Sequence, residues 1–259
     1  MAIKFKFLKD LKADKPCVIA GFPGIGYVAK IALDYLAEKL RADVYAEVYS
    51  HAFPPFIIVR ENGVIEPLKV DLLYSSLDGK DFLLITGNAQ PATPEGQHEL
   101  IDALISEISG RYRVTRVFAM AAYVVENRVG EPNIYGAATD SATMDLLKTH
   151  GVKPMTEGSI SGANGIILSY AKAIGVPAAC LLSETPAYTY YGQFADAKAA
   201  EALLKVITSI LGVSIDMTDI EEKARGSEEI LRRLSRLAEE RFIKEVPQKT
   251  FTGDLTYIG

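Results

Sequence analysis

Apolar runs alternate with segments of helical periodicity along the first ~190 residues of the chain. The runs predict strands at about 16–21, 42–48, 72–77, 82–86, 116–122 and 176–183. Apolar residues recur at intervals of three and four over about 28–40 and from residue 94 onward, which predicts helices there. Shorter helical patterns follow Asp140 and the Gly158–Gly165 stretch. This alternation predicts the α/β class, with helices on both faces of a sheet.

The segment after the second predicted strand indicates antiparallel pairing. Phe53-Pro54-Pro55 excludes a helix, and two apolar arms follow it, Phe56–Arg60 and Val64–Val70. They are joined by Glu61-Asn62-Gly63, and because an Asn-Gly pair supplies the positive φ angles of a tight turn, we predict a hairpin here. A hairpin followed by further adjacent strands makes the sheet mixed rather than wholly parallel. The segment Tyr135–Thr139 is predicted as irregular chain.

Two helices and a tail follow the α/β part of the chain. Apolar residues line one side of a helix from about Asp196 to Leu211 and form a narrow stripe on a charged helix from about Asp219 to Lys244. We therefore expect an α/β core domain at 1–195 and a C-terminal helical extension at 196–245 that packs on the core or on a neighbouring subunit. The remaining residues, 246–259, are expected to form a flexible tail.

Composition narrows the classes of function. The 259-residue chain carries a formal net charge of -5, and its Lys and Arg residues are scattered, so we expect no nucleic-acid partner. No apolar run approaches the ~18 residues of a membrane span, and Met1–Lys6 lacks the apolar block of a signal peptide. We therefore expect a cytoplasmic protein without membrane contact, in which Cys17 and Cys180 are buried free thiols.

The first glycine cluster carries the strongest candidate chemistry. Gly24-x-Gly26-x-x-Ala29 stands where an apolar run meets a helical pattern, and it fits the dinucleotide-binding fingerprint. An acidic residue, Glu47, follows about 20 residues further on, as that fingerprint requires. Such a loop can hold a pyrophosphate at a helix N-terminus. The other interpretation is a tight strand-to-helix elbow whose glycines serve backbone packing, and Pro23 inside the turn favours it.

No other stretch supplies a catalytic constellation. In the cluster Gly158–Gly165, Ile160 occupies the centre where a nucleophile elbow needs serine. The three histidines lie far apart without metal-ligand spacing, so we assign no metal. Glu184 follows an apolar strand and is placed to line a crevice, although strand-end carboxylates more often act as caps or turn residues. We predict no catalytic residue and no cofactor, and the candidate ligand pocket comprises Gly24, Gly26, Gly162 and Glu184.

Several stretches, taken in order, carry a family resemblance from about residue 16 to 245. They are Gly21–Gly26, the Phe53-Pro54-Pro55 segment before a hairpin, Gly87–Pro91 before a capped helix, Gly158–Leu168, and Ala179–Thr185. By their order and spacing, the chain resembles the proteasome assembly chaperone family in its archaeal and bacterial branch. No single stretch decides the match.

The resemblance implies a three-layer α/β/α domain of the phosphorylase/hydrolase-like kind, with a helical C-terminal extension. It also implies homo-oligomers and a non-catalytic role, namely binding of proteasome α-type subunits and promotion of ring assembly. Some members of the family are described as relatives of ATP-grasp ligases. The sequence offers no metal-binding carboxylate set and no nucleotide lysine in support of that enzymatic interpretation.

The resemblance also points to the tail. Active archaeal chaperones of the family are expected to end in a hydrophobic residue, tyrosine and any residue, with a tail that inserts between α subunits. This chain departs from the pattern, because tyrosine is third from the end and isoleucine is penultimate. A client other than the proteasome therefore stays open. The predicted partner-binding residues of the tail are Leu255, Tyr257, Ile258 and Gly259.

Two hypotheses of function remain. The first is a non-catalytic oligomeric chaperone or scaffold that binds proteasome α-type subunits or a related client by surface contacts. The alternative is a small-molecule or nucleotide-binding enzyme, ATP-grasp-like or nucleoside phosphorylase-like, that uses the glycine-rich loops between strands and helices.

Overall fold

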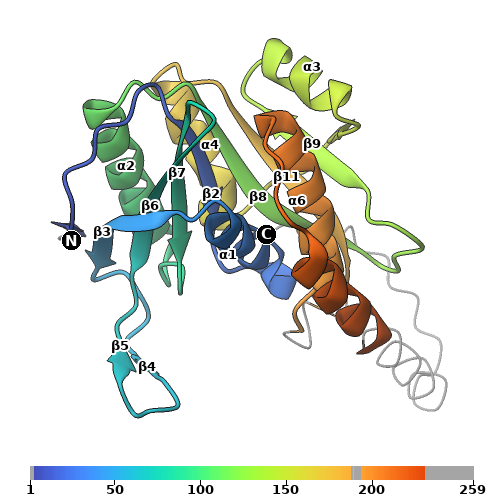
Figure 1. Cartoon of the computed structure of the whole chain (residues 1–259), viewed down its shortest axis with the longest axis horizontal. Helices are drawn as coiled ribbons and strands as arrows, with labels where there is room; N and C mark the ends of the chain where they lie inside the picture. The colour runs from blue at the N-terminus through green and yellow to red at the C-terminus, as the bar shows by residue number, and fades with distance from the viewer. Residues whose placement is uncertain (1–2, 188, 190–193, 231–259) are drawn as a thin grey trace.

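One nine-stranded mixed sheet forms the centre of the molecule (Figure 1). The computed structural model describes residues 3–187, 189 and 194–230. The strands of the sheet are β1 (Ile3–Phe7), β2 (Cys17–Gly21), β3 (Asp43–Ser50), β6 (Val70–Leu77), β7 (Lys80–Gly87), β8 (Arg116–Val125), β9 (Ile134–Ala138), β10 (Lys153–Pro154) and β11 (Ala178–Pro186). Their order across the sheet is β1-β3-β6-β7-β2-β8-β11-β9-β10.

Parallel strands occupy the middle of the sheet and antiparallel strands flank them. β2 runs parallel to both β7 and β8, and β8 runs parallel to β11. On one side β1, β3 and β6 follow in antiparallel pairs, and on the other side β9 runs antiparallel to β11. A separate two-stranded hairpin, β4 (Ile58–Val59) with β5 (Ile65–Glu66), projects away from the body (Figure 1).

Helices cover both faces of this sheet. One face is covered by α2 (Pro94–Arg111) and α4 (Gly162–Ala173). The opposite face is covered by α1 (Val28–Lys39), which follows the short 3₁₀ helix η1 (Ile25–Tyr27), by α3 (Ser141–Thr149) and by α6 (Ala197–Leu211). Residues 218–230 are also helical. The predicted three-layer α/β/α architecture with a mixed sheet is therefore confirmed.

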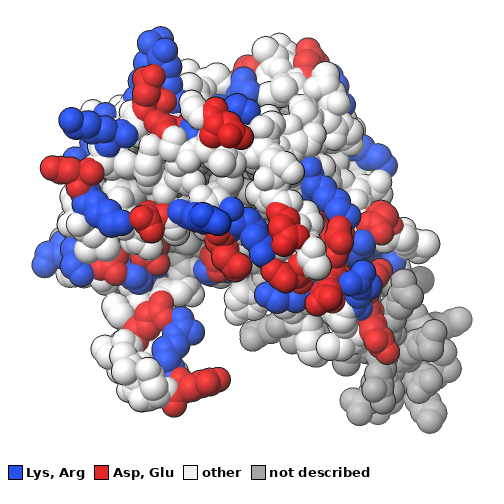
Figure 2. All heavy atoms as spheres, in the orientation of Figure 1, with Lys and Arg blue, Asp and Glu red and all other residues white. Residues whose placement is uncertain are grey.

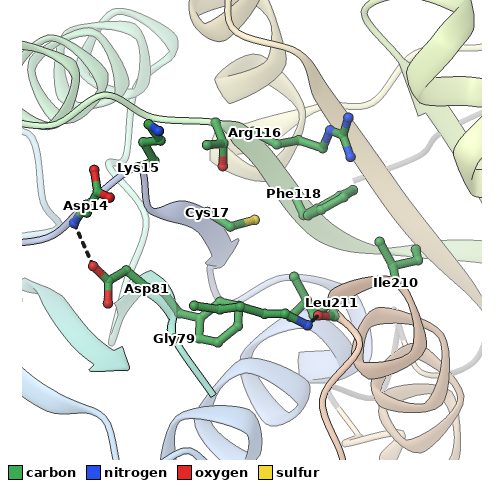
Figure 3. A pocket seen from close by; sticks show the side chains of 12 residues that line it. Asp14, Lys15, Cys17, Gly79, Asp81, Arg116, Phe118, Ile210 and Leu211 are labelled. Atoms are coloured by element: carbon green, nitrogen blue, oxygen red, sulfur yellow. Dashed lines mark hydrogen bonds between the residues drawn. The ribbon is translucent and has the colours of Figure 1, made fainter. Parts of the chain in front are cut away.

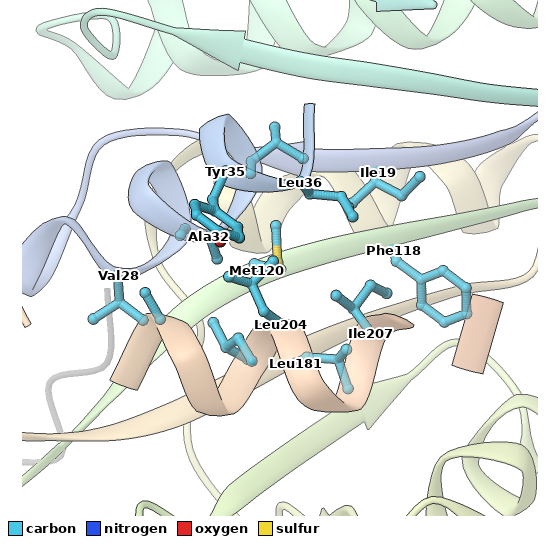
Figure 4. Packing of buried hydrophobic residues seen from close by; sticks show 14 of the residues in the cluster. Ile19, Val28, Ala32, Tyr35, Leu36, Phe118, Met120, Leu181, Leu204 and Ile207 are labelled. Carbon is cyan, nitrogen blue, oxygen red and sulfur yellow. The ribbon is translucent and has the colours of Figure 1, made fainter. Parts of the chain in front are cut away.

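Each helical layer packs on the sheet through its own apolar cluster. Figure 4 shows the one in which α1 and α6 meet the sheet, with fully buried side chains such as Ile19, Leu36 and Leu204. Successive residues of β2 point into opposite clusters, Ile19 into this one and Ala20 into the other. Burial on both faces explains why the central strands appear in the sequence as unbroken apolar runs.

Besides the two-residue β10, two strands are missing from the sequence-based prediction. The expectation of irregular chain over Tyr135–Thr139 is wrong, because Ile134–Ala138 forms β9. This strand is rich in small residues since α3 packs close to it: a Cβ on Gly136 would lie 2.7 Å from Leu147 Cδ1. The other strand, β1, is an edge strand whose alternating charged and apolar residues are half exposed. Neither strand has the apolar run by which the central strands are predicted.

The remaining expectations have mixed outcomes. No helix in the described part of the chain is both long and apolar enough to cross a bilayer. Cys17 and Cys180 are free thiols; Cys180 is buried as expected, whereas Cys17 is partly exposed. The charged helix expected to reach Lys244 is helical as far as residue 230, and its remainder lies outside the described residues. The division of the chain at residues 195 and 245 stays a prediction.

Candidate functional site at the carboxyl edge of the sheet

The predicted pocket residues belong to the edge of the sheet where the parallel strands end. The chain leaves β2 toward α1 on one face, and it leaves the neighbouring strand β7 toward α2 on the opposite face. In open α/β sheets, such a divergence creates a crevice where ligands commonly bind. The geometry of the loops at this crevice therefore decides between a ligand site and a structural elbow.

The loop after β2 is a tight elbow that requires glycine. A Cβ on Gly21 would lie 2.7 Å from Ala29 O and 2.8 Å from Leu33 Cβ, so glycine permits the close approach of α1 to β2. Gly26 has φ 60°, and the next residue, Tyr27, has φ 51°. These two left-handed residues turn the chain into α1. Chain geometry thus accounts for both glycines without a ligand.

The acidic residue of the dinucleotide fingerprint lies far from this elbow. Glu47 is on β3, and two strands, β6 and β7, separate β3 from β2. In a dinucleotide-binding fold the acidic residue follows the strand next to the glycine loop. Glu47 instead accepts hydrogen bonds from Lys6 (2.8 Å) and Lys69 (2.6 Å), which lower its pKa to about 2. It is a structural ion-pair partner between neighbouring strands.

Two side-chain amides, which we call the amide bridge, connect the elbow with the start of α4. Asn164 Oδ1 accepts a hydrogen bond from Phe22 N–H (2.8 Å), and its Nδ2 donates to Phe22 O (3.2 Å). Gln90 Nε2 donates to Pro23 O (2.5 Å), and its Oε1 accepts from Ala163 N–H (2.8 Å). The main-chain N–H groups of Phe22 and Ala163 are therefore already bonded, whereas a phosphate cradle needs such groups to face the ligand.

A buried carboxylate fastens the other side of the elbow. Asp196 is fully buried, and it forms an ion pair of 2.5 Å with Arg128, whose side chain is 4% exposed. Asp196 also accepts hydrogen bonds from Thr185 Oγ1 (2.8 Å) and from Ala199 N–H (3.0 Å), so it caps α6. Its own N–H donates to Gly26 O (2.8 Å). One residue thus joins β11, the loop after β8, the elbow and α6.

Glu184 belongs to a different polar cluster. Because successive strand residues point to opposite faces, its side chain leaves β11 on the face away from Thr185. The carboxylate accepts hydrogen bonds from Asn133 N–H and Nδ2 at 3.0 Å and from the Tyr135 hydroxyl at 3.2 Å. Burial and this nearby carboxylate raise the pKa of Tyr135. Glu184 therefore holds the loop after β8 and strand β9 against β11.

The four predicted pocket residues consequently have different neighbours. Gly24 and Gly162 lie on either side of the amide bridge: a Cβ on Gly24 would be 3.8 Å from Asn164 Nδ2, and one on Gly162 would be 2.9 Å from Gln90 Oε1. Gly26 lies against Thr185 and Asp196, whereas Glu184 lies in the Asn133 cluster. As a ligand pocket these four residues stay a prediction.

Sequence reasoning missed the residues that connect this edge. Gln90, Asn164 and Arg128 stand in loops or at the start of a helix, where no periodicity marks them. Asp196 carried a usable signal, since an aspartate directly before a helical pattern is a frequent N-cap. Its partner Arg128, which is 68 positions away in the sequence, carried no such signal.

Other candidate chemistry is sparse in the part of the chain that the structure describes. No group of three or more His, Cys, Asp or Glu side chains there is arranged to hold a metal ion. His98 Nδ1 lies 3.1 Å from the Tyr170 hydroxyl, and His150 Nδ1 lies 2.9 Å from Ser209 Oγ, both at exposed positions. The tail residues predicted to bind a partner, Leu255, Tyr257, Ile258 and Gly259, lie outside the described residues.

A cavity of about 460 Å³ lies at the opposite edge, where β2, β7 and β8 begin (Figure 3). Lys80 donates to Leu211 O (2.9 Å) at the C-terminus of α6, and Asp81 accepts from Asp14 N–H (2.6 Å). Although Cys17 is partly exposed as a residue, the surrounding protein desolvates its thiol and raises the thiol's pKa to about 12. The thiol therefore stays protonated near neutral pH and is a poor nucleophile. These polar groups serve mainly to attach α6 and the N-terminal segment.

Comparison with known proteins agrees with this fold. The sequence model of the PAC2 family matches residues 18–235. An uncharacterized protein of Methanocaldococcus jannaschii is 29% identical over 254 residues, which cover 97% of this chain and 96% of that protein. The solved structure of Pyrococcus furiosus PbaB, described as an archaeal proteasome activator, is 32% identical with a TM-score of 0.81, and the match covers 90% of this chain and 98% of that one.

A second solved structure is similar in fold. Pyrococcus furiosus PbaA, described as an archaeal homolog of proteasome-assembly chaperone, is 24% identical with a TM-score of 0.73. The match covers 93% of this chain and 95% of that one.

Proposed function

This chain belongs to the PAC2 family, and on that basis we propose that it is a non-catalytic protein that acts by binding the proteasome or its α-type subunits. The resemblance to proteasome assembly chaperones is confirmed by the family match and by the similar solved structures. We further propose that the chain works as a homo-oligomer in the cytoplasm.

One observation carries the proposal: the 32% identity with PbaB extends over 90% of this chain and 98% of that one. PbaB is described as a proteasome activator and PbaA as a homolog of an assembly chaperone. Both descriptions relate the protein to the proteasome, but one refers to activation and the other to assembly. We therefore propose proteasome binding as the activity, with assembly and activation as the two forms that it can take.

The alternative, a nucleotide or small-molecule enzyme, receives less support from the carboxyl edge. The amide bridge uses the N–H groups of Phe22 and Ala163, and Glu47 is two strands away from the elbow. A nucleotide present at a hundredfold excess over its Kd would stabilise a specific binder by about 2.7 kcal/mol. An unchanged melting temperature across nucleotides and nucleosides is expected, and a clear rise with one of them would favour the enzymatic alternative.

Proteasome binding is tested by mixing the purified chain with α-type subunits and, separately, with assembled core particles. Native electrophoresis reads association, and peptide hydrolysis by the core particle reads activation. An assembly chaperone is expected to co-migrate with free α subunits and to increase the yield of rings. An activator is expected to bind the core particle and to raise hydrolysis. Absence of association with either form would contradict the proposed function.

The predicted contact of the tail needs a separate variant. Deletion of Tyr257–Gly259 is expected to weaken association with proteasome subunits, because an aromatic side chain supplies a large contact area for a pocket on a partner. If the shortened chain binds with unchanged affinity, the tail is not the contact, and association through other surfaces still stands.

A further inference from the structure

The cavity at the amino edge of the sheet, where β2, β7 and β8 begin, contains a cation without a counter-charge. Arg116 lines this cavity, and it forms no ion pair or hydrogen bond with any residue that the structure describes. Its Nε atom is shielded from solvent. Across the face of the molecule seen in Figure 2, by contrast, Lys and Arg side chains lie beside Asp and Glu side chains. A partly buried charge without a partner is costly, so the cavity favours a ligand of opposite charge.

Strand register brings the side chains of this cavity to one face of the sheet. Cys17 on β2 pairs with Phe82 on β7 and with Arg116 on β8. Side chains paired between neighbouring strands point to the same face, and Phe118 shares that face because strand side chains alternate. It is the face that α1 and α6 cover. Leu211, the last residue of α6, closes the cavity on the helix side.

The cavity has an apolar floor and is large enough for a small molecule. Its volume of about 460 Å³ lies within the range of roughly 300–1,000 Å³ that small-molecule sites occupy. Phe82 and Phe118 line it and are each 2% exposed. The guanidinium carbon of Arg116 lies 5.9 Å from the centre of the Phe118 ring, so the cation adjoins the floor. In Figure 3, Cys17 and Phe118 lie between Arg116 on one side and Leu211 on the other.

The charged side chains that line the cavity carry a net charge of +1. Three are cations and two are carboxylates: Lys15, Lys80, Arg116, Asp14 and Asp81. A ligand with a single negative charge therefore balances the cavity.

Two of these side chains already have partners within the chain. Lys80 Nζ donates to Leu211 O (2.9 Å) and to Gly212 O (3.0 Å), where it complements the C-terminus of α6. Asp81 accepts hydrogen bonds from Asp14 N–H (2.6 Å) and from the Tyr74 hydroxyl (2.8 Å). Neither group is available to neutralise Arg116.

A carboxylate outside the lining, Asp140, also leaves Arg116 unpaired. Asp140 accepts hydrogen bonds from Thr143 N–H (2.7 Å) and the Thr143 hydroxyl (2.8 Å), and it caps α3. These hydrogen bonds are the main reason why the pKa of Asp140 is lowered, and the charge of Arg116 contributes least. Lys15, like Arg116, has no ion pair among the described residues. The two cations that remain for a ligand are therefore Arg116 and Lys15.

We propose that this cavity binds a small organic acid, whose carboxylate meets the Arg116 guanidinium and whose apolar part lies on the floor. The planar guanidinium presents paired N–H donors that match the two oxygens of a carboxylate. A phosphate group carries about two negative charges and would leave an excess negative charge beside Asp14 and Asp81. The inference is independent of proteasome binding, because it concerns a different part of the molecule from the predicted tail contact.

Four probes test the charge and the chemical class of the ligand. They are 3-phenylpropionate, its uncharged match 3-phenylpropanamide, acetate without an apolar part, and inorganic phosphate. Amide chemical shifts of the full chain, measured by NMR during titration, read where each probe binds and how tightly. We expect 3-phenylpropionate to shift the amides of Cys17, Arg116 and Phe118. Its dissociation constant is expected to be at least about tenfold lower than that of the amide or of acetate.

A matched pair of variants tests the role of the unpaired cation. Arg116→Gln removes it, whereas Arg113→Gln removes an exposed arginine that does not line the cavity. Arg116→Gln is expected to raise the dissociation constant of 3-phenylpropionate at least about tenfold, and Arg113→Gln is expected to leave it within about twofold. Arg116→Lys keeps the charge without the paired donors, and its dissociation constant is expected to lie between those of wild type and Arg116→Gln. Circular dichroism checks that each variant is folded.

Each contrary outcome overturns a stated part of the inference. Equal affinity of wild type and Arg116→Gln for 3-phenylpropionate overturns the role of Arg116. Equal affinity for the acid and its amide overturns the recognition of a carboxylate. Tighter binding of phosphate than of either carboxylate overturns the proposed class of ligand. If no probe shifts these amides at up to about 20 mM, a concentration that reveals millimolar dissociation constants, the site itself is overturned.

Discussion

The carboxyl edge of the sheet and the projecting hairpin of residues 56–66 differ in which side chains they bury: polar groups are buried at the edge, and apolar groups are exposed on the hairpin. At the edge, Asp196, Arg128 and Asn164 are buried and bonded to neighbouring segments of the same chain. On the hairpin, Ile57, Val59 and Ile65 are turned to solvent. The edge has the location of a ligand site and the bonding pattern of a structural joint. The hairpin has the sequence of an ordinary turn and the surface of an interaction site. Location in a fold is therefore a weaker guide to function than the bonding state of the groups found there.

The largest effect on stability is expected from the buried ion pair. Asp196→Asn leaves the Arg128 cation buried without a counter-charge, which costs about 3–5 kcal/mol of unfolding free energy. Urea denaturation measures the loss. The control is Asp219→Asn, which removes a carboxylate that is 58% exposed and paired with Lys39, and its cost is at most about 1 kcal/mol. If both variants lose a similar, small amount of unfolding free energy, the ion pair at the carboxyl edge contributes no more than an exposed one.

The amide bridge is expected to give the next largest effect. Asn164→Ala leaves the buried N–H and C=O groups of Phe22 without partners, at a cost of about 2–3 kcal/mol. The same substitution at Asn62, whose exposed side chain accepts a hydrogen bond from Val64 N–H in the turn of the hairpin, is expected to cost under about 1 kcal/mol. Chemical denaturation of the two variants compares them directly. A neutral Asn164→Ala would show that the bridge does not hold the elbow.

Acidic pH is expected to lower the free energy of unfolding through the ion pairs of Glu47. Hydrogen bonds from Lys6 and Lys69 lower the pKa of Glu47 from 4.5 to about 2 in the folded chain, so the unfolded chain binds the proton more readily. This contribution to stability is fully present above about pH 5 and is lost as the pH falls toward 2. Glu47→Gln is expected to flatten the pH dependence of the urea midpoint between pH 3 and 6. A Glu47→Gln variant whose urea midpoint varies with pH as steeply as that of the wild type would contradict the assignment.

The smallest effect on stability is expected from the hairpin itself. Val59→Thr changes an exposed side chain and should alter the unfolding free energy by no more than about 0.5 kcal/mol. Urea denaturation tests this value. A loss of several kcal/mol would mean that the hairpin belongs to the folded core, and its role would then be structural like that of the edge.

The sequence predicts the central elements of the fold because those elements are buried on both faces. The apolar runs of β2, β8 and β11 and the capped start of α2 at Thr93 are visible without a structure. β1 and β9 are not, since β1 lies half exposed at the edge of the sheet and β9 has small residues under α3. A local sequence pattern therefore does not predict a strand that forms because of its pairing or packing with a neighbouring element.

The candidate site shows the same limit at the level of single residues. The glycines at Gly24 and Gly26 are conspicuous in the sequence, and the elbow interpretation offered for them agrees with the φ of 60° at Gly26. Sequence spacing also proposed Glu47 as a partner of these glycines, but strand order, which spacing cannot give, separates them. The contact of Gln90 with Ala163 joins segments that are 73 positions apart in the sequence. No sequence pattern near either residue predicts such a contact.

Hydrogen–deuterium exchange of the wild-type chain, with and without nucleotide, tests both regions in one measurement. We predict that the amides of Phe22 and Ala163 are strongly protected under both conditions, because each is bonded to a side-chain amide. The amides of the hairpin between residues 57 and 65 are predicted to exchange faster, because within the described residues β4 and β5 pair only with each other. Hairpin amides as well protected as those of Phe22 and Ala163, together with protection at the carboxyl edge that depends on nucleotide, would contradict the account.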